Sequence, residues 1–202
     1  HRDLHSFPTR RSSDLFADKI AERTKGAIKI EIYPGEQLGT IPEMAEMVSQ
    51  GSVALHHNTY GGLQPLLEDL GVFDTPYLYR DVNHLLAATD PTSSPVLKEL
   101  NDKLIATRNV RVLYSFYFGT RELTSNSPIY SPKDLAGKKI RAIPSAIYMA
   151  AVEGMGAVAV PITWAEVPVA LSTGVASGQE NPVSTGRLRP LPRRPGRRGA
   201  LV

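Results

Sequence analysis

Arg141 stands at a place in the sequence where it could bind a negatively charged group. It comes near the end of a predicted strand at 138–143, just before Pro144-Ser145. In open α/β sheets, ligands sit beyond the carboxyl ends of the strands. A guanidinium suits a carboxylate because its planar fork donates two parallel hydrogen bonds and stays charged when desolvated. Arg141 is therefore our first candidate for a carboxylate anchor; the alternative is a surface strand arginine that pairs with a neighbouring glutamate.

The segments FGTRELT and GQENP supply two further polar candidates, Arg121 and Asn181. The side-chain amide of Asn181 can donate to a carboxylate while it accepts from a guanidinium, so it could orient both groups. Because a proline follows it, Asn181 could equally be only a turn residue. For Arg121 the alternative is a structural salt bridge to Glu122 or Glu180. We expect Glu180 to orient an arginine rather than to contact an anionic ligand.

Three aromatic residues are candidates for lining the same pocket. Trp164 is the sole tryptophan and stands at the first position of a predicted helix, whose N-terminus favours anions. Its alternative role is that of an aromatic residue in the hydrophobic core. Tyr148 and Tyr117 are the other two candidates.

Other chemistry is disfavoured. The chain has no cysteine, which excludes a disulfide framework, a thiolate metal site and a cysteine nucleophile. His56 and His57 are adjacent on a predicted strand and point to opposite faces, so we expect no metal site. Gly154-Met-Gly156 follows a predicted helix and precedes a strand, the reverse of a dinucleotide-binding loop. No His, Cys or Ser is positioned as a catalytic base or nucleophile. We therefore expect neither a cofactor nor an enzyme, and a small α/β enzyme remains the disfavoured alternative.

The elements that must position these residues alternate between helix and strand. Apolar spacing and end signals predict helices at 15–25, 40–50, 82–88, 96–107, 145–155 and 163–173. Alternation of β-branched residues predicts strands at 27–33, 52–57, 110–115, 138–143, 158–161 and 175–179. Short strands separated by helices indicate βαβ units, so we predict an α/β fold with parallel sheet.

Capping boxes mark the start of two of the helices. Thr40 with Glu43 opens one, and Thr163 with Glu166 opens the other. Pro168 then falls inside the second helix, where an interior proline costs ~3 kcal/mol or more. We therefore expect a local distortion at Pro168.

The charge of the chain is concentrated at its ends. Overall the net charge is +3, but residues 16–186 hold 14 Lys and Arg against 18 Asp and Glu, a net of −4. An acidic body argues against a nucleic-acid-binding surface. No apolar run approaches the length of a membrane span, so we expect no membrane insertion.

Five segments together resemble the solute-binding proteins of TRAP transporters, which include dicarboxylate- and sialate-binding receptors. Each would be weak evidence alone, but their order and spacing are specific, and the resemblance covers about residues 16–185. They are IKIEIYPGEQLG, EMAEMVSQGSVAL, LGVFDTPYLYRD, FGTRELTSNSPIYSPKDLAGKKIRAIPS and PITWAEVPVALSTGVASGQENP. Within the matched region, Pro168 stands where the family usually has Tyr, and Ser177 stands where it usually has Asp.

The resemblance implies a fold and a function. It implies a two-lobed, periplasmic-binding-protein-like architecture of type II, with lobe I at 16–115 and lobe II at 116–186. Arg141 matches the arginine of the family's KIR-x-x-P motif, which grips the substrate carboxylate, and Arg121 matches its GxR motif. The implied role is a periplasmic, monomeric receptor that captures a small organic acid anion and delivers it to the small and large permease subunits. Which carboxylate is bound stays open.

The two ends of the chain depart from the family pattern. We expect residues 1–15, which include LHSFPTRRSSDL, to be non-native or disordered, with neither the family's first strand nor a signal peptide in the sequence. Residues 187–202 hold six arginines and three prolines, and we expect a disordered tail there that a frameshift could have produced. Two alternatives follow: a non-functional fragment of such a receptor, or a protein that binds anions or nucleic acid through the basic tail.

Overall fold

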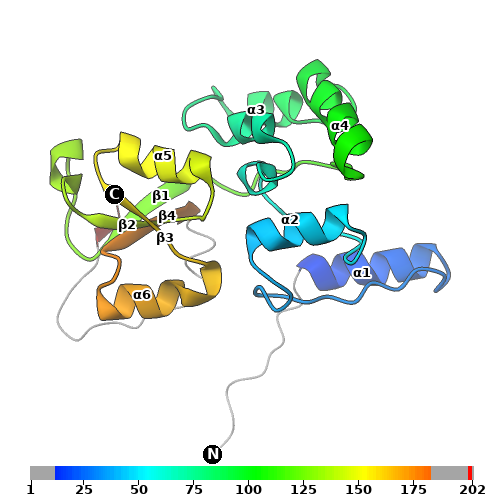
Figure 1. The fold of residues 1–202 in the computed structure, drawn as a ribbon, viewed down its shortest axis with the longest axis horizontal. Helices are drawn as coiled ribbons and strands as arrows, with labels where there is room; N and C mark the ends of the chain where they lie inside the picture. Colours follow the sequence, from blue (N-terminus) through cyan, green and yellow to red (C-terminus); the bar gives the residue numbers. More distant parts are fainter. Residues whose placement is uncertain (1–11, 183–199, 202) are drawn as a thin grey trace, which may run out of the picture. The chain divides into compact units, whose positions relative to one another are not determined.

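The computed structural model describes residues 12–182 and 200–201 (Figure 1). The chain divides into two compact units, residues 1–38 and 39–202. The expected division into lobes at 16–115 and 116–186 stays a prediction. No helix in the described ranges is long and apolar enough to cross a membrane.

In the described part of the first unit, residues 12–38, the regular element is helix α1 (Ser12–Arg23). The helix begins inside the segment 1–15 that we expected to be non-native or disordered; residues 1–11 lie outside the described residues. Gly26, with φ of 81°, takes the left-handed conformation in which a helix commonly ends. The strand predicted at 27–33 is not formed among the described residues. An alternating sequence becomes a strand only where a second strand satisfies its backbone groups.

The second unit begins with a helical region. Its regular elements are α2 (Ile41–Ser49), η1 (Gly61–Leu63), η2 (Glu68–Asp74), α3 (Val82–Ala88) and α4 (Pro95–Arg108). The capping box of α2 forms as predicted, because the backbone N–H of Thr40 donates to Glu43 Oε2 at 2.7 Å. The short helix α3 has the predicted bounds.

A hydrophobic cluster holds this helical region together. Its buried members come from α2, η2, α4, the segment between η1 and η2, and the segment after α4: Ala45, Leu66, Leu70, Phe73, Leu97, Leu100, Leu104 and Val110. The strands predicted at 52–57 and 110–115 are not assigned among the described residues. The side chain of Asn101 nevertheless satisfies both backbone groups of Val112, as a neighbouring strand would. Its Oδ1 accepts from Val112 N at 2.8 Å, and its Nδ2 donates to Val112 O at 3.2 Å.

The rest of the unit is a mixed sheet with strand order β3-β2-β4-β1-β5. Its strands are β1 (Arg121–Ser125), β2 (Lys139–Ala142), β3 (Val158–Pro161), β4 (Gly178–Pro182) and β5 (Ala200–Leu201). Strand β2 runs parallel to both β3 and β4, as βαβ units require. Strand β1 is antiparallel to β4 and β5, so the sheet is not wholly parallel as predicted.

Helices cover both faces of the sheet. Helix α5 (Ala146–Gly154) lies over one face and α6 (Val167–Thr173) over the other (Figure 1). Ile140, Ala142 and Val152 are buried in the cluster under α5. Ile162, Val167, Ala170 and Ala176 form the cluster on the α6 side. In β2, the consecutive residues Ile140, Arg141 and Ala142 are all buried, as expected for a strand that is covered on both faces.

The irregularity expected at Pro168 takes the form of a break in the predicted helix. The segment predicted as one helix at 163–173 forms two, η4 (Trp164–Glu166) followed by α6. Pro168 thereby falls in the first turn of α6, where the missing N–H would have no intrahelical partner in any case.

Part of the basic C-terminal segment belongs to the sheet. Of residues 187–202 the structure describes only Ala200–Leu201, which pair with Ser125 and Thr124 of β1. The remainder lies outside the described residues, and its disorder stays a prediction.

The core of the helical region gives a direct stability test. Leu104 is 0% exposed, whereas Val96 on the same helix is 58% exposed. We expect Leu104→Ala to lower the free energy of unfolding by about 2–5 kcal/mol, because it removes buried methyl groups and leaves a cavity. Urea unfolding followed by circular dichroism measures this. Val96→Ala is the control and should change stability far less; equal losses in the two variants would contradict this packing.

Candidate anion-binding site

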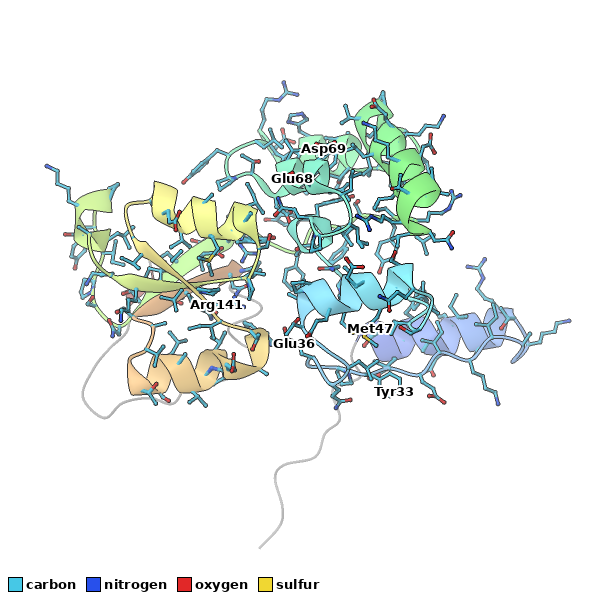
Figure 2. The ribbon with its side chains drawn as sticks, in the orientation of Figure 1. Tyr33, Glu36, Met47, Glu68, Asp69 and Arg141 are labelled. Atoms are coloured by element: carbon cyan, nitrogen blue, oxygen red, sulfur yellow. The ribbon has the colours of Figure 1, made fainter. Side chains whose placement is uncertain are left out.

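Arg141 lies buried in the sheet near the carboxyl end of β2. Only 1% of the surface of Arg141 is exposed to solvent. Its Nε donates to the carbonyl of Ile162 at 2.9 Å, and its guanidinium carbon lies 5.7 Å from the centre of the Trp164 ring. Figure 2 shows the side chain within the sheet region. Charged side chains are rarely this buried without a specific partner, so the site is built to hold a guanidinium in one orientation.

Arg121 lies at the start of β1 and is engaged by β4. Its Nη2 donates to Glu180 Oε1 at 2.8 Å, and its Nε makes a second, short hydrogen bond to the other carboxylate oxygen. This is the two-pronged arginine–carboxylate geometry. The same Nη2 also lies 3.4 Å from Asn181 Oδ1. Glu180 therefore orients an arginine, as expected, and the alternative of a structural salt bridge to Glu180 is the geometry found.

The strand register places the three polar candidates on the neighbouring strands β2, β4 and β1. Arg141 pairs with Gln179 across β2 and β4, while Arg121 lies opposite Pro182. Gln179 is buried, and its Oε1 accepts from Asn181 Nδ2 at 3.3 Å. Neighbouring strands therefore carry Arg141, Gln179, Asn181 and Arg121 in turn. Because side chains alternate along a strand, Arg141 shares one face of the sheet with Gln179 and Asn181, and Arg121 shares the other face with Glu180.

Tyr148 joins this cluster from α5. Its residue is 5% exposed, and its ring centre lies 4.9 Å from the guanidinium carbon of Arg121. Its hydroxyl donates to Asp74 Oδ2 at 2.9 Å. We did not predict a role for Asp74. The signal that could have found it is a lone carboxylate inside the apolar run LGVFDTPYLY, since such a group must be paired where the run is buried.

The other two aromatic candidates differ in position. Trp164 lies at the start of η4 and packs against the cluster on the α6 side, so it serves the core while it faces Arg141. Tyr117 is 41% exposed, and its hydroxyl bonds to that of Thr120 at 2.6 Å. No contact that the structure records within its described ranges joins Tyr117 to either arginine. Its role in lining a pocket stays a prediction.

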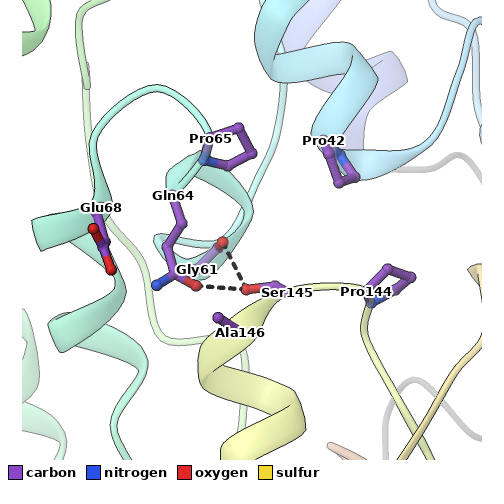
Figure 3. Close-up of a pocket in the computed structure, with 8 residues that line it drawn as sticks. All are labelled: Pro42, Gly61, Gln64, Pro65, Glu68, Pro144, Ser145 and Ala146. Carbon is purple, nitrogen blue, oxygen red and sulfur yellow. Dashed lines mark hydrogen bonds between the residues drawn. The ribbon is translucent and has the colours of Figure 1, made fainter.

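A pocket of about 310 Å³ opens beside α5 (Figure 3). The hydroxyl of Ser145 lies 2.7 Å from Gln64 Oε1 and 2.9 Å from the carbonyl of Gly61, and it can donate to only one of them at a time. None of the six predicted site residues lines this pocket. Its lining is Pro42, Gly61, Gln64, Pro65, Glu68, Pro144, Ser145 and Ala146.

Burial and charge act in opposite directions on the ionisable groups of the cluster. Burial disfavours the charged form of Arg121, but the hydrogen bonds and charge of Glu180 outweigh it, so the pKa of the guanidinium is raised. Burial also raises the pKa of the Asp74 carboxyl, and the hydrogen bonds from Gly61 and Tyr148 offset this only in part. The pKa of Tyr148 is raised by burial and then by Asp74.

The adjacent histidines lie outside this cluster. Burial lowers the pKa of both His56 and His57, and His57 stacks on Phe116 with ring centres 4.6 Å apart. Among the described residues there is no group of three or more His, Cys, Asp or Glu that could hold a metal ion.

Residues 5–188 match the family model described as bacterial extracellular solute-binding protein, family 7. The chain belongs to this family. The sialic acid-binding periplasmic protein SiaP of Vibrio cholerae is 30% identical over 86% of the chain and 53% of its own length. The C4-dicarboxylate-binding periplasmic protein DctP of Rhodobacter capsulatus is 33% identical over 83% of the chain and 50% of its own length.

Solved TRAP periplasmic solute-binding proteins share the fold. The Actinobacillus succinogenes protein with bound L-galactonate superposes with a TM-score of 0.76 at 29% identity, over 87% of this chain and 57% of that one. The Ochrobacterium anthropi protein with bound L-fuconate gives 0.77 at 30% identity, over 89% and 60%. The chain of this family member thus spans about half the length of the curated relatives it matches.

The pairing of Arg121 with Glu180 can be measured by a double-mutant cycle. We expect Arg121→Gln, Glu180→Gln and the double variant to give a coupling of about 0.5–3 kcal/mol in urea unfolding, because the pair is partly buried and two-pronged. The exposed pair Lys103–Glu99 on α4 is the control and should couple far more weakly. Additive effects at 121 and 180 would contradict the assigned ion pair.

Proposed function

We propose that this chain is the substrate-binding receptor of a TRAP-type transporter, or the part of one, and that it captures a small organic carboxylate outside the cytoplasmic membrane. The single observation that carries the proposal is Arg141, a buried arginine near the carboxyl end of a parallel strand in a sheet of this family. A guanidinium is the preferred group for two-pronged recognition of a carboxylate.

The names of the relatives support this ligand class. Sialic acid, C4-dicarboxylates, L-galactonate and L-fuconate differ in size and in hydroxyl content, but each carries a carboxylate. A shared carboxylate with variable remainders is consistent with one fixed cation and a changeable surround. In our proposal Arg141 binds the carboxylate, Asn181 donates a further hydrogen bond, and Trp164 covers the guanidinium.

Capture requires the parts of the receptor to move. Arg141 is covered in this structure, so a ligand reaches it only when the segments over it separate. Hinge opening and closure is the general device for this in two-lobed binding proteins, and the ligand stabilises the closed form by contacting both lobes. The ligand leaves unchanged, and the loaded, monomeric receptor then docks on the small and large permease subunits. No reaction is catalysed.

Arg141 provides the test. We expect Arg141→Ala to weaken binding by about 2–5 kcal/mol, the cost of removing one partner of a desolvated charge pair. Isothermal titration of the chain with sialic acid, L-galactonate, L-fuconate and a C4-dicarboxylate measures this. Arg111→Ala, at an exposed arginine outside the site, is the matched control and should bind like the parent chain.

Two outcomes would contradict the proposal. If the folded parent chain binds none of these acids, it is not a receptor in this form. If Arg141→Ala binds an acid as tightly as Arg111→Ala does, then Arg141 is not the anchor.

A further inference from the structure

The carboxylate of Asp74 lies where three segments meet. It ends η2, and its Oδ2 accepts from the backbone N–H of Gly61 at 2.6 Å and from the hydroxyl of Tyr148 at 2.9 Å. Its neighbour Phe73 is buried in the hydrophobic cluster of the helical region. Asp74 therefore ties that region to α5 through a charge-assisted hydrogen bond, which is stronger than one between neutral groups.

Gly61 makes this close approach possible. A Cβ at Gly61 would lie 2.7 Å from Ile147 Cγ2, 3.0 Å from Tyr148 Cε2 and 3.1 Å from Asp74 Oδ2. The backbone of η1 can therefore donate to Asp74 and lie against Tyr148 only because residue 61 has no side chain. The contact is built into the packing of η1, η2 and α5.

From Tyr148 the connection continues to the anion site. The ring that Asp74 holds by its hydroxyl is the ring that faces the guanidinium of Arg121. Arg121 in turn binds Glu180 and lies 3.4 Å from Asn181 Oδ1. A continuous line of contacts thus runs from the helical region to the strand that carries Asn181.

We propose that Asp74 is a positioning residue of the anion site: by holding the hydroxyl of Tyr148 it fixes the ring against which the guanidinium of Arg121, and through it Asn181, is aligned. This assignment rests on the proposed function for its importance to ligand binding. The positioning itself is a property of the chain without ligand and can be measured separately.

The side-chain Nε–H signal of Arg121 in nitrogen-15 NMR reports the positioning, with the signal assigned by its loss in Arg121→Lys. Tyr148→Phe keeps the ring and removes only the hydroxyl that Asp74 holds. We expect Tyr148→Phe and Asp74→Asn to shift this signal and to speed its hydrogen exchange, because the ring that lies over the Arg121 guanidinium is no longer held by its hydroxyl. Asp69→Asn, at an exposed carboxylate of η2 that Figure 2 labels, is the matched control and should match the parent chain.

A pH profile separates positioning from general loosening. Asp74 is faced by Tyr148, Arg121, Tyr60 and Tyr79, and Glu180 is the other carboxylate at Arg121. Because its pKa is raised, Asp74 should give the Arg121 signal a step above the ordinary aspartate range. That step should vanish in Asp74→Asn and persist in Glu180→Gln.

Unchanged Arg121 signals in both Asp74→Asn and Tyr148→Phe would overturn the assignment, as would a pH step that survives Asp74→Asn. Circular dichroism checks that each variant is folded. If Asp74→Asn does not fold, the milder Tyr148→Phe decides alone. Since no ligand is added, failure here is independent of whether the chain binds an organic acid.

Discussion

The burial of two guanidinium groups is the constraint on which the rest of the structure depends. An ionised side chain removed from water costs several kcal/mol unless the protein supplies hydrogen bonds and charge in return. Arg121 receives these from Glu180, and Arg141 is held by the carbonyl of Ile162 beside Trp164. For those partners to be in place, β1 has to pair with β4, and β2 has to pair with β3, which leads into Ile162 and Trp164.

Helix α5 connects the sheet to the helical region. Its first turn is held by Gln64, whose Oε1 accepts from Ile147 N at 3.3 Å, and by Asp74, which accepts from the hydroxyl of Tyr148. A binding protein that closes on its ligand needs contacts that carry a change at one element to another. In this chain Tyr148 of α5 contacts both Asp74 of the helical region and Arg121 of the sheet.

Local signals predicted most of the helices and two of the strands. The capping box at Thr40, the bounds of α3 and the strand at 158–161 depend on residues close in sequence, and the structure has each of them. The predicted strands at 27–33, 52–57 and 110–115 are not assigned among the described residues. Alternation predicts a strand only on condition that a partner is present, and the partner is a distant part of the chain. Pro168 shows the same limit at a helix, because a break at Glu166 turned an unfavourable interior position into a favourable first turn.

The sequence by itself determined the family and the α/β class, because the order and spacing of the motifs can be followed along the chain. It could not decide which partner each arginine takes. Glu180 rather than Glu122 binds Arg121 because side chains alternate along β1 and β4, and only their antiparallel register brings Glu180 within reach. The contact of Asp74 with Tyr148 also depends on tertiary structure. Because η2 and α5 lie far apart in sequence, only their packing brings the buried carboxylate of Asp74 against Tyr148.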